Sequence, residues 1–328
     1  MYNNAHQEEV MFMAIAKEFN INLKGRDFIS LHDFTADEIY YLLHVAESIK
    51  AKQKAGKPHS LLKGKTLGMI FTKSSTRTRV SFEVAMYQLG GNALFLNERD
   101  IQLGRGETIP DTARVLSRYL DGIMIRTYKH EDVQELAEYA DIPVINGLTD
   151  LLHPCQVLAD LLTIKEKKGS LAGLKLVYVG DGNNMAHSLM FGGAKMGMHV
   201  VIASPEGYKP DPKITALAAK DAIKHGGKIE LSTDPFAAVT EADVIYTDVW
   251  ASMGQEAEHA KRLKDFNGYQ VNQAMVNLAR KDVIVMHCLP AHRGEEISAE
   301  VLEGPHSVVF DEAENRLHAQ KAILALVM

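Results

Sequence analysis

Residues 74–79 combine hydroxyl side chains with arginines in an order that suits a bound anion. They read Ser-Ser-Thr-Arg-Thr-Arg, follow an apolar run that ends at Phe71, and precede Val80, Val84 and Tyr87 at helical spacing. At a helix start, free N–H groups, the positive end of the helix dipole and guanidinium groups together favour phosphate. A solvated N-terminal cap would explain a lone Ser-x-x-Arg, but not hydroxyls interleaved with two arginines. The segment lacks the glycines and lysine of a Walker loop, which disfavours nucleotide hydrolysis.

Three more polar side chains stand where a reacting carbonyl could be held. Arg126 ends a short apolar run, and His153 and Gln156 flank Pro154 and Cys155 at the start of a helical segment. A carbonyl that becomes an oxyanion needs preorganised donors, which an arginine, a histidine and a glutamine amide can supply together. Each is a weak signal alone, because a His-Pro pair is usually a loop and a strand-end arginine is usually a surface charge. Their weight comes from occurring together with residues 74–79.

A glycine cluster in the second half of the chain permits a competing interpretation. Residues 180–184 read Gly-Asp-Gly-Asn-Asn after a good strand, which resembles a dinucleotide-binding turn with Glu206 as a ribose partner. Met185 stands where the third glycine would be, and two successive asparagines favour a small polar ligand instead. An NAD-dependent dehydrogenase is therefore the alternative enzyme class, and a non-enzymatic amino-acid-binding module is a third possibility.

Asp248 and Cys288 are the chemically informative residues at two later strand ends. A carboxylate at position 248 would attract an ammonium group and repel a second carboxylate on an amino-acid substrate. The plainer interpretation of Asp248 is a turn or helix cap, and that of Cys288 is a small buried hydrophobic residue. Ser252 and Met253 lie in the segment that follows Asp248.

These residues must be positioned by an α/β fold with mostly parallel sheets flanked by helices. From residue 65 onward, short runs rich in Val and Ile alternate with longer segments of helical spacing. Ligands of such sheets bind beyond the carboxyl ends of the strands, where these polar residues stand. The expected strands are residues 66–71, 122–125, 144–145, 174–179, 199–203, 243–246 and 283–287.

The chain is long enough for two domains. A helix over residues 156–168 ends at Gly169, and a new strand begins after Gly173, which predicts a first domain over 1–168 and a second over 169–311. Residues 312–328 carry apolar side chains at helical spacing and are expected to form a C-terminal helix that packs back toward the first domain.

Composition excludes several partner classes. The 328 residues are 46% hydrophobic, and acids exceed bases by six, 42 against 36, so no positive field favours nucleic acid. The first residues lack a long apolar core, so we expect a cytoplasmic protein with no membrane partner. Two cysteines, Cys155 and Cys288, are too few for a disulfide scaffold and lack zinc-ligand spacing. The remaining histidines, which include His59, His130, His259 and His306, show no partners at ligand spacing and receive no role.

Residues 74–79 closely resemble the carbamoyl-phosphate loop of the aspartate and ornithine carbamoyltransferases. Further motifs follow in the family's order over nearly the whole chain: Arg126, then His-Pro-Cys-Gln at 153–156, His-Cys-Leu-Pro at 287–290 and Asp-Glu-Ala-Glu-Asn-Arg at 311–316. Residues 248–254, Asp-Val-Trp-Ala-Ser-Met-Gly, are similar to the ornithine loop rather than to the pattern of the aspartate enzymes.

The resemblance implies transfer of the carbamoyl group of carbamoyl phosphate to the side-chain amine of ornithine, giving citrulline and phosphate. It places this reaction in arginine metabolism, with biosynthesis as the expected direction, although the residues are common to synthesis and breakdown. It implies no metal and no organic cofactor. It also implies a homotrimer, in which Gln102, within the loop 100–104, reaches the active site of a neighbouring subunit.

The resemblance further assigns residues to each ligand. The first domain becomes the carbamoyl-phosphate-binding domain and the second the ornithine-binding domain. We expect the neutral amine to attack the polarised carbonyl directly, so that Cys288 orients the amine and forms no covalent intermediate. The expected carbamoyl-phosphate contacts are Ser75, Thr76, Arg77, Thr78, Gln102, Arg126, His153, Gln156, Cys288, Leu289 and Arg316; the ornithine contacts are Asn184, Asp248, Ser252 and Met253; and the catalytic residues are Arg126, His153, Cys288 and Arg316.

Overall fold

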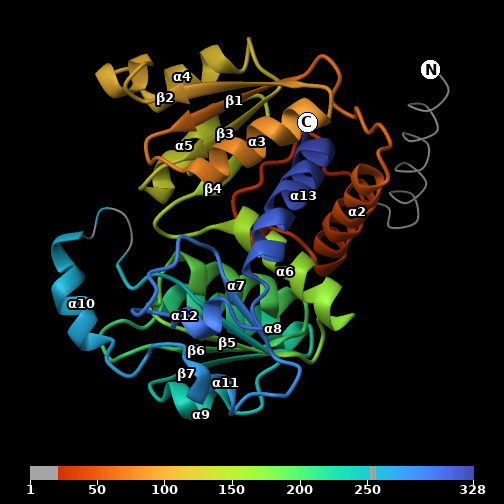
Figure 1. Cartoon of the computed structure of the whole chain (residues 1–328). Helices are drawn as coiled ribbons and strands as arrows, with labels where there is room; N and C mark the ends of the chain where they lie inside the picture. Colours follow the sequence, from red (N-terminus) through yellow and green to blue (C-terminus); the bar gives the residue numbers. More distant parts are fainter. Residues whose placement is uncertain (1–20, 252–253, 255) are drawn as a thin grey trace. The chain divides into compact units, whose positions relative to one another are not determined.

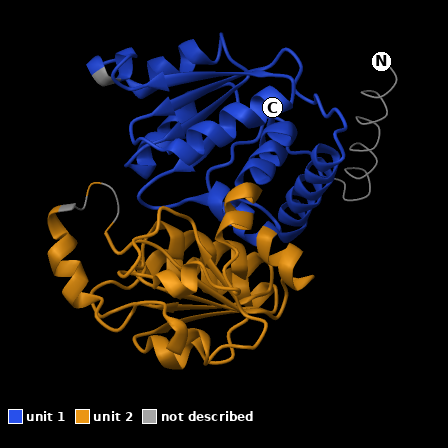
Figure 2. Ribbon diagram, in the orientation of Figure 1, with its two compact units in different colours: residues 1–162, 316–328 blue, residues 163–315 orange. Residues whose placement is uncertain are grey.

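The chain folds into two compact units, coloured separately in Figure 2. The computed structural model describes residues 21–251, 254 and 256–328. Unit 1 comprises the chain up to Leu162 together with Arg316–Met328, and unit 2 comprises Thr163–Asn315. The assignment of residues 1–168 to carbamoyl phosphate and of residues 169–311 to ornithine, with 312–328 as a separate C-terminal helix, stays a prediction.

Unit 1 contains a four-stranded sheet in which every neighbouring pair is parallel, in the order β2-β1-β3-β4 (Figure 1). Its strands are β1 (Thr66–Phe71), β2 (Asn92–Asn97), β3 (Gly122–Arg126) and β4 (Val144–Leu148). Each parallel connection passes through a helix, as this topology requires. The helices of this unit are α2 (Ala36–Lys54), α3 (Thr76–Gln88), α4 (Ile109–Leu116), α5 (His130–Tyr139) and the first part of α6 (Pro154–Lys168).

Unit 2 contains a five-stranded parallel sheet in the order β7-β6-β5-β8-β9. The chain reverses its direction of travel across the sheet beside β5, and ligands of such sheets bind at this switch point. The strands are β5 (Lys175–Val179), β6 (His199–Ala203), β7 (Lys228–Ser232), β8 (Val244–Thr247) and β9 (Ile284–His287). The helices are α7 (Asn184–Lys195), α8 (Pro212–Lys224), α9 (Pro235–Val239), α10 (His259–Asp265), α11 (Gln273–Val276) and α12 (Ala299–Leu302).

The predicted fold class is confirmed, including the C-terminal helix that returns to the first unit. Seven expected strands are present, and five of them differ from the predicted range by one residue or more at one end or both. The sequence analysis missed β2 and β7, which lie at the sheet edges. Both have partly exposed side chains along most of their length, and they therefore lack the continuous apolar run by which the inner strands were found.

The last helix, α13 (Val309–Val327), belongs to unit 1 from Arg316 onward. Within that unit the carbonyl oxygen of Val327 accepts a hydrogen bond from the N–H of Gly25, at 2.8 Å. Gly122, the first residue of β3, lies against Met328, so a Cβ at this position would meet its side chain at 3.1 Å. Among the described residues, no helix is both long enough and apolar enough to cross a membrane.

Lys321 is a fully buried cation on the unit 1 part of α13. Its amine hydrogen bonds to Oε1 of Gln53, on α2, and lies 3.0 Å from Nε2 of His59. Burial disfavours the charged form and lowers the pKa of Lys321 from 10.5 to about 8. The folded protein therefore binds fewer protons at this position than the unfolded chain does between those two values.

We predict that Lys321 makes stability depend on alkaline pH. Because its folded pKa is depressed, the parent should gain stability relative to Lys321→Met as pH rises from about 8 to about 10.5, by roughly 3 kcal/mol in total. Urea unfolding of both proteins at several pH values measures this difference. Lys63→Met, at an exposed lysine of the same unit, is the control and should show little change. A constant difference between the parent and Lys321→Met would contradict the prediction.

Candidate active site

The loop after β1 forms the N-terminus of α3 as the sequence predicts. Ser75 is the N-cap residue, and its side-chain oxygen accepts a hydrogen bond from the N–H of Thr78 at 3.2 Å. The first turn of α3 carries no acidic residue, so nothing within that turn offsets the positive end of the helix dipole. Thr76, Arg77 and Thr78 form this turn, and backbone N–H groups at a helix start are suited to an anion.

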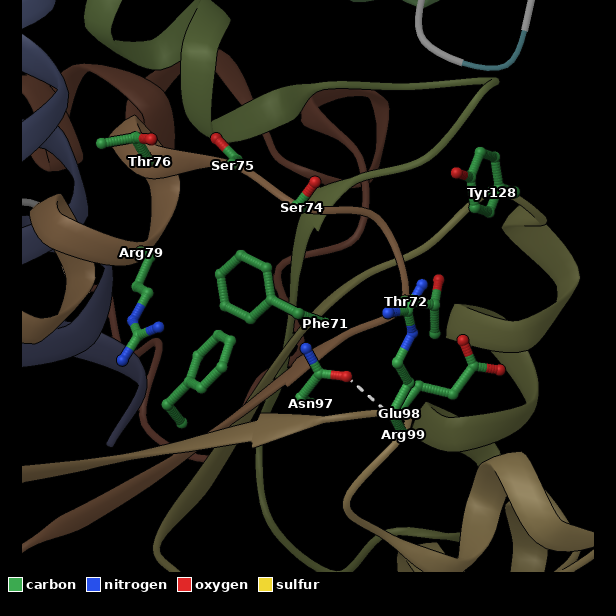
Figure 3. A pocket seen from close by; sticks show the side chains of 11 residues that line it. Phe71, Thr72, Ser74, Ser75, Thr76, Arg79, Asn97, Glu98, Arg99 and Tyr128 are labelled. Carbon is green, nitrogen blue, oxygen red and sulfur yellow. Dashed lines mark hydrogen bonds between the residues drawn. The ribbon is translucent and has the colours of Figure 1, made fainter.

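A pocket of about 470 Å³ lies beside this loop, and Figure 3 shows its lining. Ser74, Ser75 and Thr76 lie along one side of it. Arg79 also lines the pocket, but its guanidinium lies 3.6 Å from the centroid of the Phe95 ring and forms an ion pair with Glu83 at 3.0 Å. The other lining residues are Phe71, Thr72, Asn97, Glu98, Arg99 and Tyr128.

Arg316, from α13, connects the α3 loop with α6. One guanidinium nitrogen donates to Oε1 of Gln156 at 2.6 Å, and another donates to Oγ1 of Thr78 at 2.9 Å. The amide nitrogen of Gln156 donates in turn to Asp160 at 2.8 Å. All four side chains are buried, so these bonds fix the arginine in an environment where electrostatic interactions are strong.

Two further cations lie beside this loop, one at the end of β3 and one just after β1. Arg126, the last residue of β3, donates through Nε to the carbonyl oxygen of Lys73 at 3.2 Å. Lys73 directly precedes residues 74–79, and its amine forms an ion pair with Asp150 at 3.0 Å. Both side chains are buried. The unit 1 sheet thus delivers positive charge at the carboxyl ends of β1 and β3.

His153 lies among these cations, immediately before α6. It is buried, and desolvation is the main cause that holds its pKa well below the usual value. The positive charges of Arg316, Arg126, Arg77 and Lys73 lower the pKa further. The imidazole is therefore neutral near pH 7, and one of its ring nitrogens carries a proton that can be donated.

The unit 1 arrangement suits a small anion with a polar carbonyl. Cationic side chains and the start of α3 would stabilise a phosphate group. Neutral His153 and charged Arg316 offer donors for an oxygen atom that gains negative charge. Cys155, also buried here, has its pKa raised by desolvation to about 12, so it is a thiol at neutral pH and offers no nucleophile.

Unit 2 brings together residues from the ends of β8 and β9. Asp248, just after β8, accepts hydrogen bonds through Oδ1 from the Cys288 thiol at 3.1 Å and from the N–H of Val249 at 2.8 Å. Its Oδ2 accepts from the amide of Asn183 at 3.3 Å. Asp248 is only 7% exposed, so it presents a largely desolvated carboxylate that could pair with a cation.

Cys288 is positioned by the buried residues around it. The preceding residue, His287, donates its backbone N–H to Oε2 of Glu312 at 2.9 Å, and its ring lies 3.0 Å from Glu296. The N–H of Leu289 donates to the other ring nitrogen of His287 at 2.8 Å. Leu289 has a positive φ of 58°, a conformation uncommon for a residue with a side chain. This network fixes where the thiol and the neighbouring backbone point.

The glycine cluster at 180–184 is not shaped for a dinucleotide. The N–H of Gly182 donates to the carbonyl oxygen of Tyr208 at 2.8 Å, and a Cβ on Gly182 would lie 2.2 Å from the backbone nitrogen of Pro210. The chain itself therefore fills the space that a pyrophosphate would need against this glycine. Asp181 is paired with Arg262 at 2.6 Å, while Glu206, the expected ribose partner, is exposed and paired with Lys209.

The structure gathers most, but not all, of the residues singled out from sequence. Gln102 is exposed on a short 3₁₀ helix (Gln102–Arg105), and Asn184 is buried in the first turn of α7. Ser252 and Met253 lie outside the described residues. Sequence reasoning missed Lys73, although it directly precedes residues 74–79. It also missed Asn183, which hydrogen bonds to Asp248; the adjacent asparagines were the available signal.

Comparison with known proteins identifies the family. The model of the carbamoyl-phosphate-binding domain of aspartate/ornithine carbamoyltransferases matches residues 26–166, and that of the Asp/Orn-binding domain matches 172–327. A protein of Symbiobacterium thermophilum named ornithine carbamoyltransferase is 65% identical over 306 residues, which cover 93% of this chain and 99% of that protein.

Two further comparisons involve Pyrococcus furiosus. A protein of this organism named ornithine carbamoyltransferase, anabolic, is 63% identical over 308 residues, which cover 94% of this chain and 98% of that protein. The solved structure of ornithine carbamoyltransferase from P. furiosus has a TM-score of 0.92 at 63% identity, and the match covers 94% of this chain and 98% of that one. With both domain models matched and such identity over nearly the full length, this chain belongs to the aspartate/ornithine carbamoyltransferase family.

Proposed function

We propose that this chain is an ornithine carbamoyltransferase, which transfers the carbamoyl group of carbamoyl phosphate to the side-chain amine of L-ornithine. The observation that carries the proposal is a set of cations that lies beside the start of α3 and acts on neutral His153. The close relatives named ornithine carbamoyltransferase support the choice of ornithine. The direct test is a citrulline assay in which ornithine, putrescine, acetylornithine and aspartate are compared. Turnover of ornithine is expected, and turnover of aspartate alone would overturn the assignment.

Carbamoyl phosphate binds through its phosphate at the α3 loop. Ser75, Thr76, Arg77 and Thr78 contact the phosphate oxygens, because this segment offers hydroxyls, the backbone N–H groups of a helix start and a guanidinium. The leaving phosphate gains charge as the bond to the carbamoyl carbon breaks. The helix start and Arg77 stabilise that charge without any reorganisation of the site.

The carbamoyl oxygen is polarised by Arg126, His153 and Arg316. Attack by an amine puts negative charge on this oxygen in the tetrahedral intermediate, and fixed donors stabilise that charge more than the ground state. Gln156 holds Arg316 at 2.6 Å and contacts the carbamoyl group. His153 acts as a neutral donor, because its depressed pKa prevents it from being protonated at working pH.

Ornithine is oriented in unit 2, with Asp248 attracting its side-chain ammonium. Asn184 binds the α-amino acid group, as do Ser252 and Met253. Cys288 and Leu289 contact the reacting groups, and Cys288 orients the amine. The amine attacks the carbamoyl carbon directly after losing a proton, so no protein nucleophile is required. Biosynthesis of arginine is the proposed direction, supported by the anabolic naming of the P. furiosus relative.

We also propose a homotrimer with shared active sites. Gln102 is exposed on its 3₁₀ helix, which supports a contact with a second subunit. It would complete the carbamoyl-phosphate site of that subunit.

Arg77→Ala is predicted to weaken binding of both carbamoyl phosphate and inorganic phosphate by about 10- to 100-fold, because a charge-assisted contact is lost. Arg79→Ala is the matched variant in the same turn, and it should lose far less, since Arg79 is paired with Glu83. Calorimetric titration with both anions measures the two effects. Equal affinity of Arg77→Ala and the parent would remove Arg77 from the site.

Turnover at subsaturating ornithine should rise as pH increases from neutral. The attacking amine resembles that of lysine, with a reference pKa of about 10.4, and cannot attack while it is protonated.

Asp248→Asn should raise the KM for ornithine about 10- to 100-fold at neutral pH, because a charge-assisted partner of the ammonium is lost. Phosphate affinity serves as the control, since unit 1 is untouched. A flat pH profile in the parent, or an unchanged KM in the variant, would show that the amine is placed wrongly.

Mixing two inactive proteins tests the shared site. Arg77→Ala and Gln102→Ala subunits, exchanged into common oligomers, should recover part of the activity, because some sites then contain neither substitution. Activity after exchange is compared with that of each protein exchanged with itself. No recovery, despite subunit exchange proven by differently tagged chains, would count against a role for Gln102 in a neighbouring site.

A further inference from the structure

A turn after β9 gathers three possible metal ligands away from the residues assigned to the reaction. His292, Glu295 and Glu296 each offer one atom, and these three atoms lie within 4.8 Å of one another. The turn is fixed by its backbone, since the N–H of Glu295 donates to the carbonyl oxygen of His292 at 2.9 Å. Gly294, with a φ of 94°, supplies the left-handed conformation that the turn requires.

His259 adds a fourth group from a different element. It is the first residue of α10, and its Nε2 lies 3.0 Å from Oε2 of Glu295. The sequence gave His259 no role, because its partner is 36 positions away along the chain. The side chains of His259 and His292 are 42% and 45% exposed, so an ion can reach the cluster from solvent.

Glu296 is the observation that points to a ligand. Its side chain is fully buried, and its Oε1 accepts from the backbone N–H of His292 at 2.6 Å and lies 3.0 Å from the His287 ring. Among the described residues, its Oε2 has no hydrogen-bond partner and lies 4.0 Å from Nδ1 of His292. A buried carboxylate oxygen without a partner is costly. Histidine–glutamate ion pairing explains the contacts of Glu295, but it leaves this oxygen unexplained.

Three separations among these four side chains are close to those expected around a tetrahedral ion. Metal–ligand bonds of about 2.1 Å place the ligands of zinc roughly 3.4 Å apart. The observed separations are 3.0 Å for His259 and Glu295, 3.7 Å for His292 and Glu295, and 4.0 Å for His292 and Glu296. Two imidazoles and two carboxylates form a ligand set that suits zinc, and the two negative charges would be neutralised by one divalent cation.

We propose that His259, His292, Glu295 and Glu296 bind one divalent transition-metal ion, with Zn²⁺ as the best-matched species. The ion ties α10 to the turn at 292–296. Through Oε1 of Glu296 it also holds the ring of His287, as outer-sphere contacts commonly do around metal sites. Because it binds only the folded unit, it raises the free energy of unfolding with the logarithm of its concentration over its Kd once that concentration exceeds the Kd.

Calorimetric titration of Zn²⁺ into the metal-stripped full chain tests the proposal, together with thermal unfolding at each metal concentration. His292→Ala and His259→Ala should each weaken the affinity at least tenfold and abolish the rise in Tm. Both residues are partly exposed, so the variants should fold, which circular dichroism checks. His225→Ala, at an exposed histidine elsewhere in unit 2, is the matched control and should bind as the parent does.

A second cluster, Asp248, His287 and Cys288, could compete for the metal, and the test must separate the two. Cys288→Ser should leave the proposed site intact, and Co²⁺ bound there should show no near-ultraviolet sulfur-to-metal charge-transfer band. Loss of Zn²⁺ binding in Cys288→Ser would overturn the proposal, as would parent-like binding in His292→Ala and His259→Ala. Absence of Zn²⁺ binding in the parent would overturn it as well.

Discussion

Mutual repulsion among cations that lie close together around one buried histidine is the constraint on which unit 1 depends. Lys73, Arg77, Arg126 and Arg316 all act electrostatically on buried His153, and like charges at such a site are unfavourable without compensation. Part of the compensation is built in: Asp150 pairs with Lys73, and Gln156 and Thr78 accept from Arg316. The remaining positive potential would favour the binding of a small dianion. The same potential adds to the effect of burial in lowering the pKa of His153, so the cations act both on the anion site and on the proton state of its histidine.

The C-terminal helix carries residues that matter to both units. Glu312 accepts from the hydroxyl of Tyr246 at 2.9 Å and from the N–H of His287, and thereby steadies the strand end beside Cys288. Arg316, four positions later on α13, hydrogen bonds to Gln156 and Thr78 in unit 1. A substitution that shortens or kinks this helix would therefore disturb the anion site and the Asp248–Cys288 pair together. Within unit 1, buried Lys321 makes the same helix sensitive to pH.

The features that could be predicted from the sequence are those set by residues close together along the chain. Inner strands such as β1 and β6 were found with their bounds, because buried parallel strands are continuous apolar runs. The edge strand β7, Lys-Ile-Glu-Leu-Ser, is nowhere fully buried and reads as a polar segment. The Ser75 cap was readable because capping is local. The bond from Arg316 to Thr78 spans 238 positions, and the cluster of His259 with Glu295 spans 36, so no spacing rule predicts either contact. The resemblance to the family indicated Arg316 as a site residue, whereas no feature of the sequence indicated the contact between His259 and Glu295.

The geometry around Cys288 favours direct attack by the amine over a covalent route. Its thiol donates to Oδ1 of Asp248 at 3.1 Å, so a carboxylate lies directly beside the sulfur. A nucleophilic cysteine requires the thiolate, which cationic neighbours stabilise and a neighbouring carboxylate opposes. Lys73, Arg126 and Arg316 instead lie beside the α3 loop in unit 1, where we propose that phosphate binds. Asp248 is better suited to draw in an ammonium group, with Cys288 and Asn183 fixing its two oxygens. This distribution of charge supports the proposed mechanism, in which the amine is the nucleophile and the protein orients it.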